Sequence, residues 1–417
     1  MGLMTRRVVV TGMGIIASNG IGQQAFWSAL QAGRSGITLL QRFDTSRMPI
    51  RVGGEVRDFE VEHHINRKLA MRTDRMTHFT LAAANEALQD ASLQLEKENP
   101  QRIGAVIANG AGGIEFVAKQ LEAHYTKGPR SMSAFSAIAW LQVANVGQVS
   151  IHHGFQGFSK TPVNDTVGGL NALGTAYRAI RRGSADIILA GGSEAHLHPL
   201  MLVVMQRQEN CVPGDDPTAY RPFDRRANGL ILGEGAGICV LEDYEHARER
   251  GAQIYGEIIG YSQSNDAYPL THPLAAQTSS PYYAQALQAA LQEAEVSLEQ
   301  LGYISLDGHA TPPADTAEAQ ALQQVAEERL AQIPVSVPRT MFGHTFAAAG
   351  ALDTIAALLA LKHEYIPPTI NSKDLDPRYG LDLVRDEPRP LRQGTVLLGA
   401  RGRGGVNAAL VIKKQEN

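Results

Sequence analysis

The chain of 417 residues carries 38 lysines and arginines against 42 aspartates and glutamates, a formal net charge of −4. This balance argues against a nucleic-acid partner or a polybasic membrane contact, because both need clustered cationic surface. Apolar residues make up 44% of the chain, enough to bury a large core, and no stretch approaches the roughly 18 uninterrupted apolar residues of a membrane span. Only Cys211 and Cys239 are present and the first residues form no signal segment, so we expect a soluble cytoplasmic protein without a disulfide framework.

The predicted elements repeat in the same order in the two halves of the chain. The first half begins with a β-branched run and a glycine-rich turn at 8–20, followed by a helix at 75–93 and a strand at 103–110. A second helix at 165–183, a strand at 185–192 and a closing strand at 233–242 complete it. The second half repeats this order at 254–266, 282–298, 303–310, 343–363 and 402–414. Four matched blocks in matching order predict an internal duplication.

The alternation of short apolar strands with helices predicts an α/β fold whose mostly parallel sheets are covered on both faces. The duplication adds an internal pseudo-twofold and divides the chain into an N-terminal half, 1–250, and a C-terminal half, 251–417. Two long segments rich in turn formers, 39–61 and 210–226, are expected on the surface near the mouth of a site.

The helix that begins at Asp165 and Thr166 is the strongest candidate for a functional element. It carries Gly168, Gly169 and Gly174 in its first turns, at a cost in helix stability, so some group must approach its backbone closely. A helix N-terminus offers free N–H groups that suit a nucleophile or a carbonyl oxyanion. The alternative is that Asp165 or Thr166 is an ordinary N-cap.

Signals for a cofactor or a metal are weak. The sequence GMGIIA at 12–17 follows a strand as a dinucleotide fingerprint does, but no acidic residue ends a second strand about 20 residues later. The histidine pairs His152-His153 and His196-x-His198 lack a cysteine or carboxylate at ligand spacing, so loop or capping roles are favoured. We expect no cofactor and no metal.

Several segments together resemble the β-ketoacyl synthases of the thiolase superfamily, over essentially the whole chain and in the same order. They are NDTVGGLNALGTAYRAIRRGSADIILAGGSEA at 164–195, RPFDRRANGLILGEGAGICVLED at 221–243, SNDAYPLTHP at 264–273, RTMFGH at 339–344 and ARGRGGVNAALV at 400–411. The resemblance implies a thiolase-like five-layer αβαβα fold from two duplicated halves.

The resemblance also locates a degenerate catalytic site. Active synthases carry a cysteine in a pattern like ACATGxHAIG, and Thr166 occupies that position here. His309 in DGHATPPAD resembles the first catalytic histidine of HGTxTPxxD, and His344 in RTMFGH resembles the second, of KSMTGH. Arg339 stands where synthases carry a lysine. A threonine hydroxyl needs stronger base activation than a thiol and is a poorer leaving group.

The departures from the synthase pattern resemble one subgroup, the chain-length factors of type II polyketide synthases, also called ketosynthase β subunits. Arg401 and Arg403 in ARGRGG replace the two phenylalanines of SFGFGG, the second of which gates the acyl pocket, and a cation there would oppose an apolar chain unless it is paired. Chain-length factors lack the active cysteine and pair with a catalytic ketosynthase α subunit. In such pairs the growing chain lies in a tunnel at the shared interface.

The apolar segment 132–149, which includes Phe135, suits an obligate contact, although ordinary core packing is the alternative. By resemblance, Ile114, Val117 and Leu121 match positions that line the chain tunnel, and their spacing puts them on one face of a helix. Amphipathic packing within the chain is the alternative for these three residues. Their aliphatic side chains are smaller than the phenylalanine of some relatives, which implies a deeper tunnel.

The sequence therefore predicts a non-nucleophilic subunit that pairs with a ketosynthase α subunit and an acyl carrier protein bearing malonyl groups and the growing polyketide. One rival is a malonyl-carrier-protein decarboxylase that uses His309 and His344 to make the starter unit, which needs oxyanion stabilisation rather than a thiol. A second is a stand-alone synthase that uses Thr166. The third is a scaffold that leaves product length unchanged.

Overall fold

A computed structural model describes residues 6–209, 211–272 and 277–415. Its main feature is a 12-stranded mixed sheet in the order β13-β11-β10-β15-β16-β9-β1-β8-β7-β5-β6, with β2 (Gly20–Ile21) beside β1. The strands of this path are β1 (Val8–Ala17), β5 (Ile103–Ala108), β6 (Ser159–Lys160), β7 (Ile187–Glu194), β8 (Gly235–Asp243), β9 (Gly256–Asn265), β10 (Leu301–Ser305), β11 (Pro334–Ser336), β13 (Asp382–Leu383), β15 (Thr395–Gly402) and β16 (Val406–Lys413). Two short pairs, β3 (Thr38–Leu39) with β4 (Val52–Gly53) and β12 (Tyr365–Ile366) with β14 (Arg389–Pro390), lie apart from it.

The duplication is visible in the strand order. The sequence β5-β7-β8-β1 on one side of the sheet matches β10-β15-β16-β9 on the other, and the two sets meet where β1 pairs antiparallel with β9. The boundary at residue 250 stays a prediction.

The expectation of mostly parallel sheets is wrong for the centre of the molecule, because the central strands pair antiparallel in turn, in the order β7, β8, β1, β9, β16 and β15. An apolar run shows only that both faces of a strand are buried. These antiparallel strands are covered on both faces, so their sequences resemble those of parallel strands.

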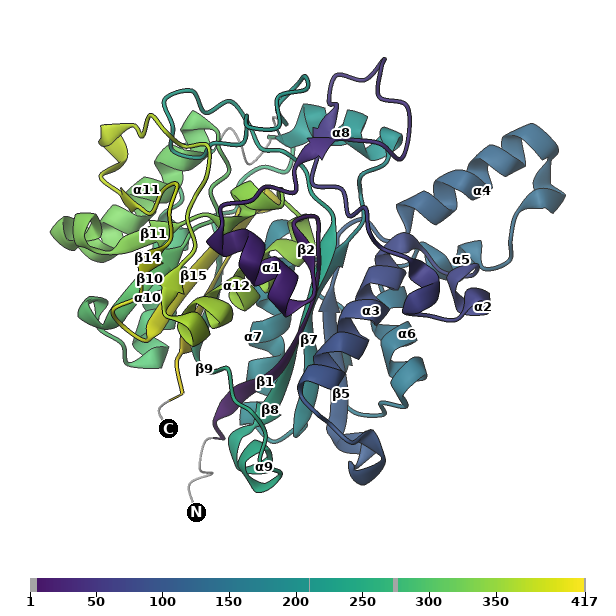
Figure 1. Cartoon of the computed structure of the whole chain (residues 1–417), viewed down its shortest axis with the longest axis horizontal. Coiled ribbons are helices and arrows are strands. Elements are labelled where there is room, and N and C mark those ends of the chain that lie inside the picture. Colours follow the sequence, from purple (N-terminus) through teal and green to yellow (C-terminus); the bar gives the residue numbers. More distant parts are fainter. Residues whose placement is uncertain (1–5, 210, 273–276, 416–417) are drawn as a thin grey trace.

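Helices form the remaining layers (Figure 1). The central layer is α7 (Gly168–Arg181) with α12 (Ala349–His363), which contact each other and strands of both halves. One outer layer contains α3 (Arg75–Asp90) and α6 (Ala144–His153), and the other α10 (Pro281–Ala294) and α11 (Pro312–Ala326). The predicted thiolase-like αβαβα fold is confirmed. The other α-helices are α1 (Gln23–Gln31), α2 (Arg67–Ala70), α4 (Ile114–Lys127), α5 (Ser136–Ala139), α8 (Pro199–Glu209) and α9 (Tyr244–Glu249).

The stretch Phe346–His363, which includes α12, is the one described segment long and apolar enough to cross a membrane, and 89% of it is buried inside the fold. A helix that is apolar on all sides is expected at the centre of a layered core, where sheets cover both of its faces. The apolar character of α12 is therefore explained by its position between the two halves of the sheet.

The two long segments expected on the surface are partly buried. Ile50 and Val52 from the first and Tyr220 from the second belong to one apolar cluster, and Ile50 bridges to Gly214. The turn formers in these segments were correctly read as loops, but the apolar residues between them pack the two loops against each other. Asn210 lies outside the described residues.

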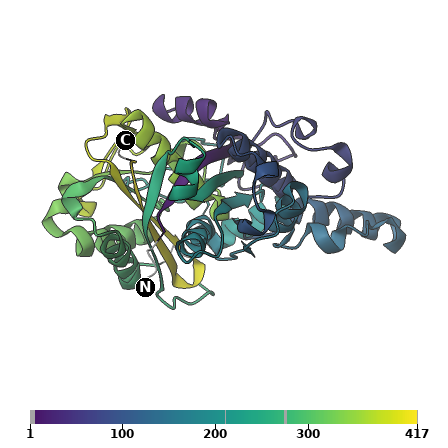
Figure 2. The same cartoon turned by 90° about the horizontal axis from the view of Figure 1, so that it is seen from below.

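The helix α4 projects from the body of the chain, which is plain in both views (Figures 1 and 2). Every residue of α4 is described and none of its side chains is buried. After α4 the chain returns through α5 to α6. We call α4 together with residues 128–143 the arm.

Candidate functional site

Thr166 lies in the 3-10 turn Asp165–Val167 that leads into α7, and it is buried. Its hydroxyl donates a hydrogen bond to the backbone carbonyl of Arg401, at the end of β15. Neither Asp165 nor Thr166 caps the helix with its side chain, so the N-cap interpretation is wrong. The backbone of Asp165 has a φ of 52°, a left-handed conformation that is uncommon outside glycine.

The glycines of α7 leave room for other parts of the protein to approach the helix backbone. A Cβ on Gly169 would lie 2.7 Å from the backbone nitrogen of Ala351 in α12, and one on Gly174 would lie 2.2 Å from the ring of Tyr261. The expected close approach is therefore present, and the approaching groups are the second central helix and an aromatic ring of β9.

His309 and His344 face each other with ring centroids 6.0 Å apart in an edge-to-face arrangement. Burial lowers the pKa of His309 to about 4. Burial, with the nearby charge of Arg339, lowers the pKa of His344 well below its ordinary value. Both imidazoles are therefore neutral near pH 7.

Arg339 is fully buried and joins three groups around His344. Its guanidinium lies 2.6 Å from Asp307 Oδ1 and 2.6 Å from Asp353 Oδ2, and Nη1 is 3.0 Å from His344 Nε2. The backbone N–H of Phe346 lies 3.3 Å from Nδ1 of the same ring, a longer contact with a neutral donor. The charged contact is the stronger of the two, so Nε2 of His344 accepts.

The two arginines at the gate position, Arg401 and Arg403, have different roles. Arg401 is fully buried and lies 3.6 Å from Glu318 Oε2 and 3.9 Å from Asp307 Oδ2, with its guanidinium 5.7 Å from the centroid of the Tyr283 ring. Arg401 is thus part of a buried ion cluster, and burial raises the pKa of Glu318 even beside this cation. The condition for a cation at this position, that it be paired, is met.

Arg403 is the residue of the gate pair that reaches a pocket. Its side chain forms an ion pair with Asp165, with Nη2 to Oδ1 at 2.6 Å, and its backbone N–H donates to Asp165 Oδ2 at 2.9 Å. The pocket has a volume of about 390 Å³ and is largely apolar. Its wall includes Asp165, Arg403, Glu194, His196, Phe346, Met201, Val204, Met205 and Leu270.

The predicted tunnel residues lie on the arm, apart from the histidines. Ile114 and Val117 are half-buried and Leu121 is 41% exposed, so packing inside this chain leaves all three partly uncovered. Phe135 is 37% exposed, and the guanidinium of Arg72 lies over its ring at 4.7 Å. Core packing, the alternative for 132–149, is right for the end of this segment, where Val146 and Val149 are buried. It is wrong for most of 132–143, where Ile138, Trp140 and Val143 are more than half exposed.

The two cysteines are buried at other places in the fold. Cys239 pairs with Met13 and Ala190 in the middle of the sheet, and Cys211 forms a bridge with Leu230. Burial raises the pKa of the Cys239 thiol far above its ordinary value, so it is not a thiolate. In the described part of the chain no group of three or more histidine, cysteine, aspartate or glutamate residues could hold a metal ion.

The sequence profile of the β-ketoacyl synthase N-terminal domain matches residues 5–247, and that of the C-terminal domain matches residues 255–373. The chain belongs to the β-ketoacyl synthase family. Within this family, the tetracenomycin polyketide synthase ketoacyl synthase beta subunit of Streptomyces glaucescens is 42% identical over 98% of both chains. A 3-oxoacyl-[acyl-carrier-protein] synthase 2 of Vibrio cholerae is 36% identical over 98% of this chain and 99% of that protein.

Solved structures of related synthases agree with this assignment. The ishigamide ketosynthase/chain length factor superposes with a TM-score of 0.92 at 31% identity and covers 99% of this chain and all of that one. A type II polyketide synthase ketosynthase, AntDE, in complex with its acyl-carrier protein AntF, superposes with a TM-score of 0.88 at 30% identity, with 99% and 100% coverage. The resemblance to chain-length factors that the motifs indicate is therefore confirmed.

Sequence reasoning missed two features of this synthase fold. His196 lies in the loop after β7, as expected, but its burial in the pocket wall, with its ring edge-on to Phe346, was not predicted. His198 is the one that caps, accepting from the N–H of Leu200. The second feature is the pair of buried carboxylates Asp315 and Glu318, which accept from the backbone N–H groups of Ala310 and Gly308 on either side of His309. Their i, i+3 spacing in α11 was the available signal.

Proposed function

We propose that this chain is the chain-length-determining, non-nucleophilic subunit of a heterodimeric ketosynthase in type II polyketide biosynthesis, with an aromatic or polyene product. The observation that carries the proposal is the arm, whose apolar side chains the chain leaves partly uncovered. Isolated apolar residues are common on surfaces, but a contiguous run of them marks an interaction site. The proposed location is the cytoplasm.

The proposed partner is a ketosynthase α subunit with a reactive cysteine. That cysteine would take the growing acyl chain from the carrier protein, malonyl carrier protein would lose carbon dioxide, and the resulting carbanion would attack the acyl thioester. The present chain would complete the partner's fold and bound the tunnel in which the product grows. Its proposed contribution comes from Ile114, Val117 and Leu121, spread along a 14-residue helix about 20 Å long.

The state of Thr166 supports a subunit that does not carry acyl groups. Its hydroxyl proton is donated to the Arg401 carbonyl, which cannot act as a base. Nε2 of His344 already accepts a hydrogen bond from Arg339. A stand-alone synthase that uses Thr166 therefore has little support from this geometry.

The test is a pair of tryptophan variants in the assembled heterodimer. We expect Leu121→Trp to shorten the products because it fills the tunnel face, and Glu122→Trp, at the exposed neighbouring position, to leave product length unchanged. Size-exclusion chromatography must first show that both variants still pair. If Leu121→Trp pairs normally and yields products of the original length, the chain is a scaffold and the proposal is wrong.

The decarboxylase alternative has one observation in its favour, which is that two neutral imidazoles are retained side by side in an edge-to-face arrangement. A neutral imidazole can donate one N–H to an oxyanion. The isolated chain, mixed with malonyl carrier protein, would then release carbon dioxide, and His309→Ala would abolish the release. If the wild type and His309→Ala both release carbon dioxide only at the background rate, this activity is excluded.

A further inference from the structure

The direction of α4 is fixed at its base. Because none of its side chains is buried, no hydrophobic stripe holds it against the body, and a helix of 14 residues is marginal on its own in water. Gly112 makes the turn into the helix with a φ of 67°, and a Cβ there would lie 2.1 Å from the carbonyl oxygen of Trp140. The tight turn fixes where α4 begins, and other contacts must fix where it points.

One buried carboxylate caps two helices at this base. Asp74 Oδ1 accepts from the N–H of Met76 at 2.8 Å, in the first turn of α3, and Oδ2 accepts from the N–H of Phe116 at 2.8 Å, in the first turn of α4. Asp74 thereby ties the start of the arm to a core helix. Burial raises its pKa to about 6, which is consistent with a carboxyl group enclosed between the two helix ends.

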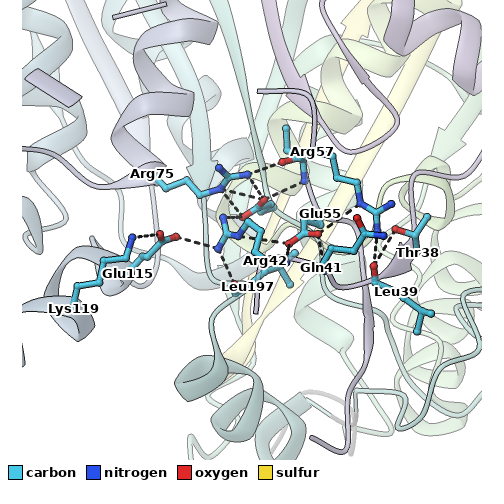
Figure 3. Close-up of polar contacts among 12 residues, drawn as sticks. Thr38, Leu39, Gln41, Arg42, Glu55, Arg57, Arg75, Glu115, Lys119 and Leu197 are labelled. Atoms are coloured by element: carbon cyan, nitrogen blue, oxygen red, sulfur yellow. Dashed lines mark hydrogen bonds and ion pairs between the residues drawn. The ribbon is translucent and has the colours of Figure 1, made fainter. Parts of the chain in front are cut away.

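An ion-pair network crosses from the arm to the core beside this cap (Figure 3). Arg42 Nη2 lies 3.0 Å from Glu115 Oε2, and Glu115 also accepts from Lys119 Nζ at 2.7 Å, one turn further along α4. The same Nη2 donates to the carbonyl of Leu197 at 3.0 Å. One guanidinium therefore bonds the first turn of the arm and the segment that follows β7.

The core end of the network is anchored by buried carboxylates. Glu234, immediately before β8, is fully buried and lies 3.4 Å from Arg42 Nη1 and 2.8 Å from Arg75 Nη2. Glu55 is also buried and lies 3.5 Å from Arg42 Nε. Arg42 is thus held rigidly on three sides, and its fourth contact is Glu115 on the arm.

We propose that Arg42 is a positioning residue for product length, which sets the angle of α4 through Glu115 and thereby the depth of the tunnel along Ile114, Val117 and Leu121. This inference rests on the proposed function. A helix that pivots at its first turn moves most at its far end, so a small change at Glu115 displaces Leu121 by more than Ile114. The Arg42 and Glu115 side chains are 24% and 19% exposed, so the pair is partly screened by solvent.

The experiment compares Glu115→Gln, Arg42→Gln and the double variant in the assembled heterodimer. Glu115→Gln is the cleaner change, because Glu115 lies on the arm and Arg42 keeps both buried partners. The matched control is Lys119→Gln, which removes the other partner of Glu115 and leaves the contact with Arg42. Leu121→Trp is included in the same series to test the proposed function.

We expect Glu115→Gln and Arg42→Gln each to change the ratio of full-length to other products by about two- to fivefold, the range that a partly exposed ion pair can supply. The double variant should change it no more than the larger single change, because both substitutions remove the same contact between Arg42 and Glu115. Lys119→Gln should leave the ratio unchanged, and the Tm of Glu115→Gln should stay at that of the wild type.

Three results would overturn the inference in distinguishable ways. If Leu121→Trp shortens the product while Glu115→Gln and Arg42→Gln leave the ratio unchanged, the tunnel exists and Arg42 does not position it. If Leu121→Trp also has no effect in an intact heterodimer, the proposed function itself fails, and the positioning role falls with it. An equal effect of Lys119→Gln would assign the change to general loss of charge on the arm.

Discussion

Arg339 donates a hydrogen bond from Nη1 to Nε2 of His344 across 3.0 Å, in a part of the core where both side chains are fully buried. A guanidinium carries donors only, so the contact uses the lone pair of Nε2 and leaves the imidazole proton on Nδ1. A ring in that tautomer cannot donate from Nε2 to an oxyanion. The contact with Arg339 therefore limits what the retained histidine can do.

The first prediction concerns the ion cluster that Arg339 holds together. Replacing it in Arg339→Met leaves Asp307 and Asp353 buried without their cation, and we expect the free energy of unfolding to fall by about 3–5 kcal/mol. Denaturant unfolding measures the change. Arg378→Met is the control, because its pair with Asp376 has an arginine side chain that is 76% exposed, and such a pair contributes at most about 1 kcal/mol. Equal losses of unfolding free energy in the two variants would contradict the expectation that the buried ion cluster contributes more to stability than the exposed pair.

The second prediction is that Thr166→Cys alone does not create an active synthase. The new thiol would be buried before the start of α7 beside the Arg401 carbonyl, and His344 would still accept a hydrogen bond from Arg339. Without a base the thiol stays protonated, and base assistance is commonly worth about 10²–10⁴ in rate. Mass spectrometry after incubation with acyl carrier protein should detect no acyl adduct on residue 166. A rapid, stoichiometric adduct would show that the site is still competent.

The layered fold could be predicted because its evidence is spread over the whole sequence. The strand at Val8–Ala17 and the helix at Arg75–Asp90 lie where their patterns indicate, within a few residues at their ends. Strand direction could not be predicted, because an apolar run such as that of β8 records burial on both faces and carries no information on which neighbour pairs with it.

The site was predictable only in part. Motif order located Thr166, His309 and His344, but the sequence gives no sign that Arg401 turns into the core while Arg403 pairs with Asp165. Those two residues are two positions apart, which would put both side chains on one face of a continuing strand, but β15 ends at Gly402 and Arg403 begins the 3-10 turn Arg403–Gly405. The pocket wall at His196 likewise depends on how a loop folds back, which local patterns do not encode.

The third prediction tests the arm as an interface. Trp140 is 54% exposed, and a buried tryptophan at the centre of a contact commonly contributes at least about 2 kcal/mol to binding. We expect Trp140→Asp to weaken pairing with the α subunit by about 30-fold or more while its Tm stays close to that of the wild type. Tyr365→Asp, at a 40% exposed position in β12, is the control. Pairing that is equally strong in both variants, measured by calorimetry or size exclusion, would remove Trp140 from the interface.

The last prediction uses the pocket histidine. Burial, with the charge of Arg403 nearby, lowers the pKa of His196 to about 3, against about 6.5 in the unfolded chain. Below pH 6.5 the unfolded state binds a proton that the folded state does not, so His196 makes the fold lose stability as the pH falls from 6.5 towards 3. Between pH 7 and pH 5 the free energy of unfolding of the wild type should therefore fall by about 2 kcal/mol more than that of His196→Leu. The exposed His63→Leu is the control and should track the wild type; a His196→Leu curve parallel to the wild-type curve would mean that this imidazole takes up its proton equally well in the folded protein.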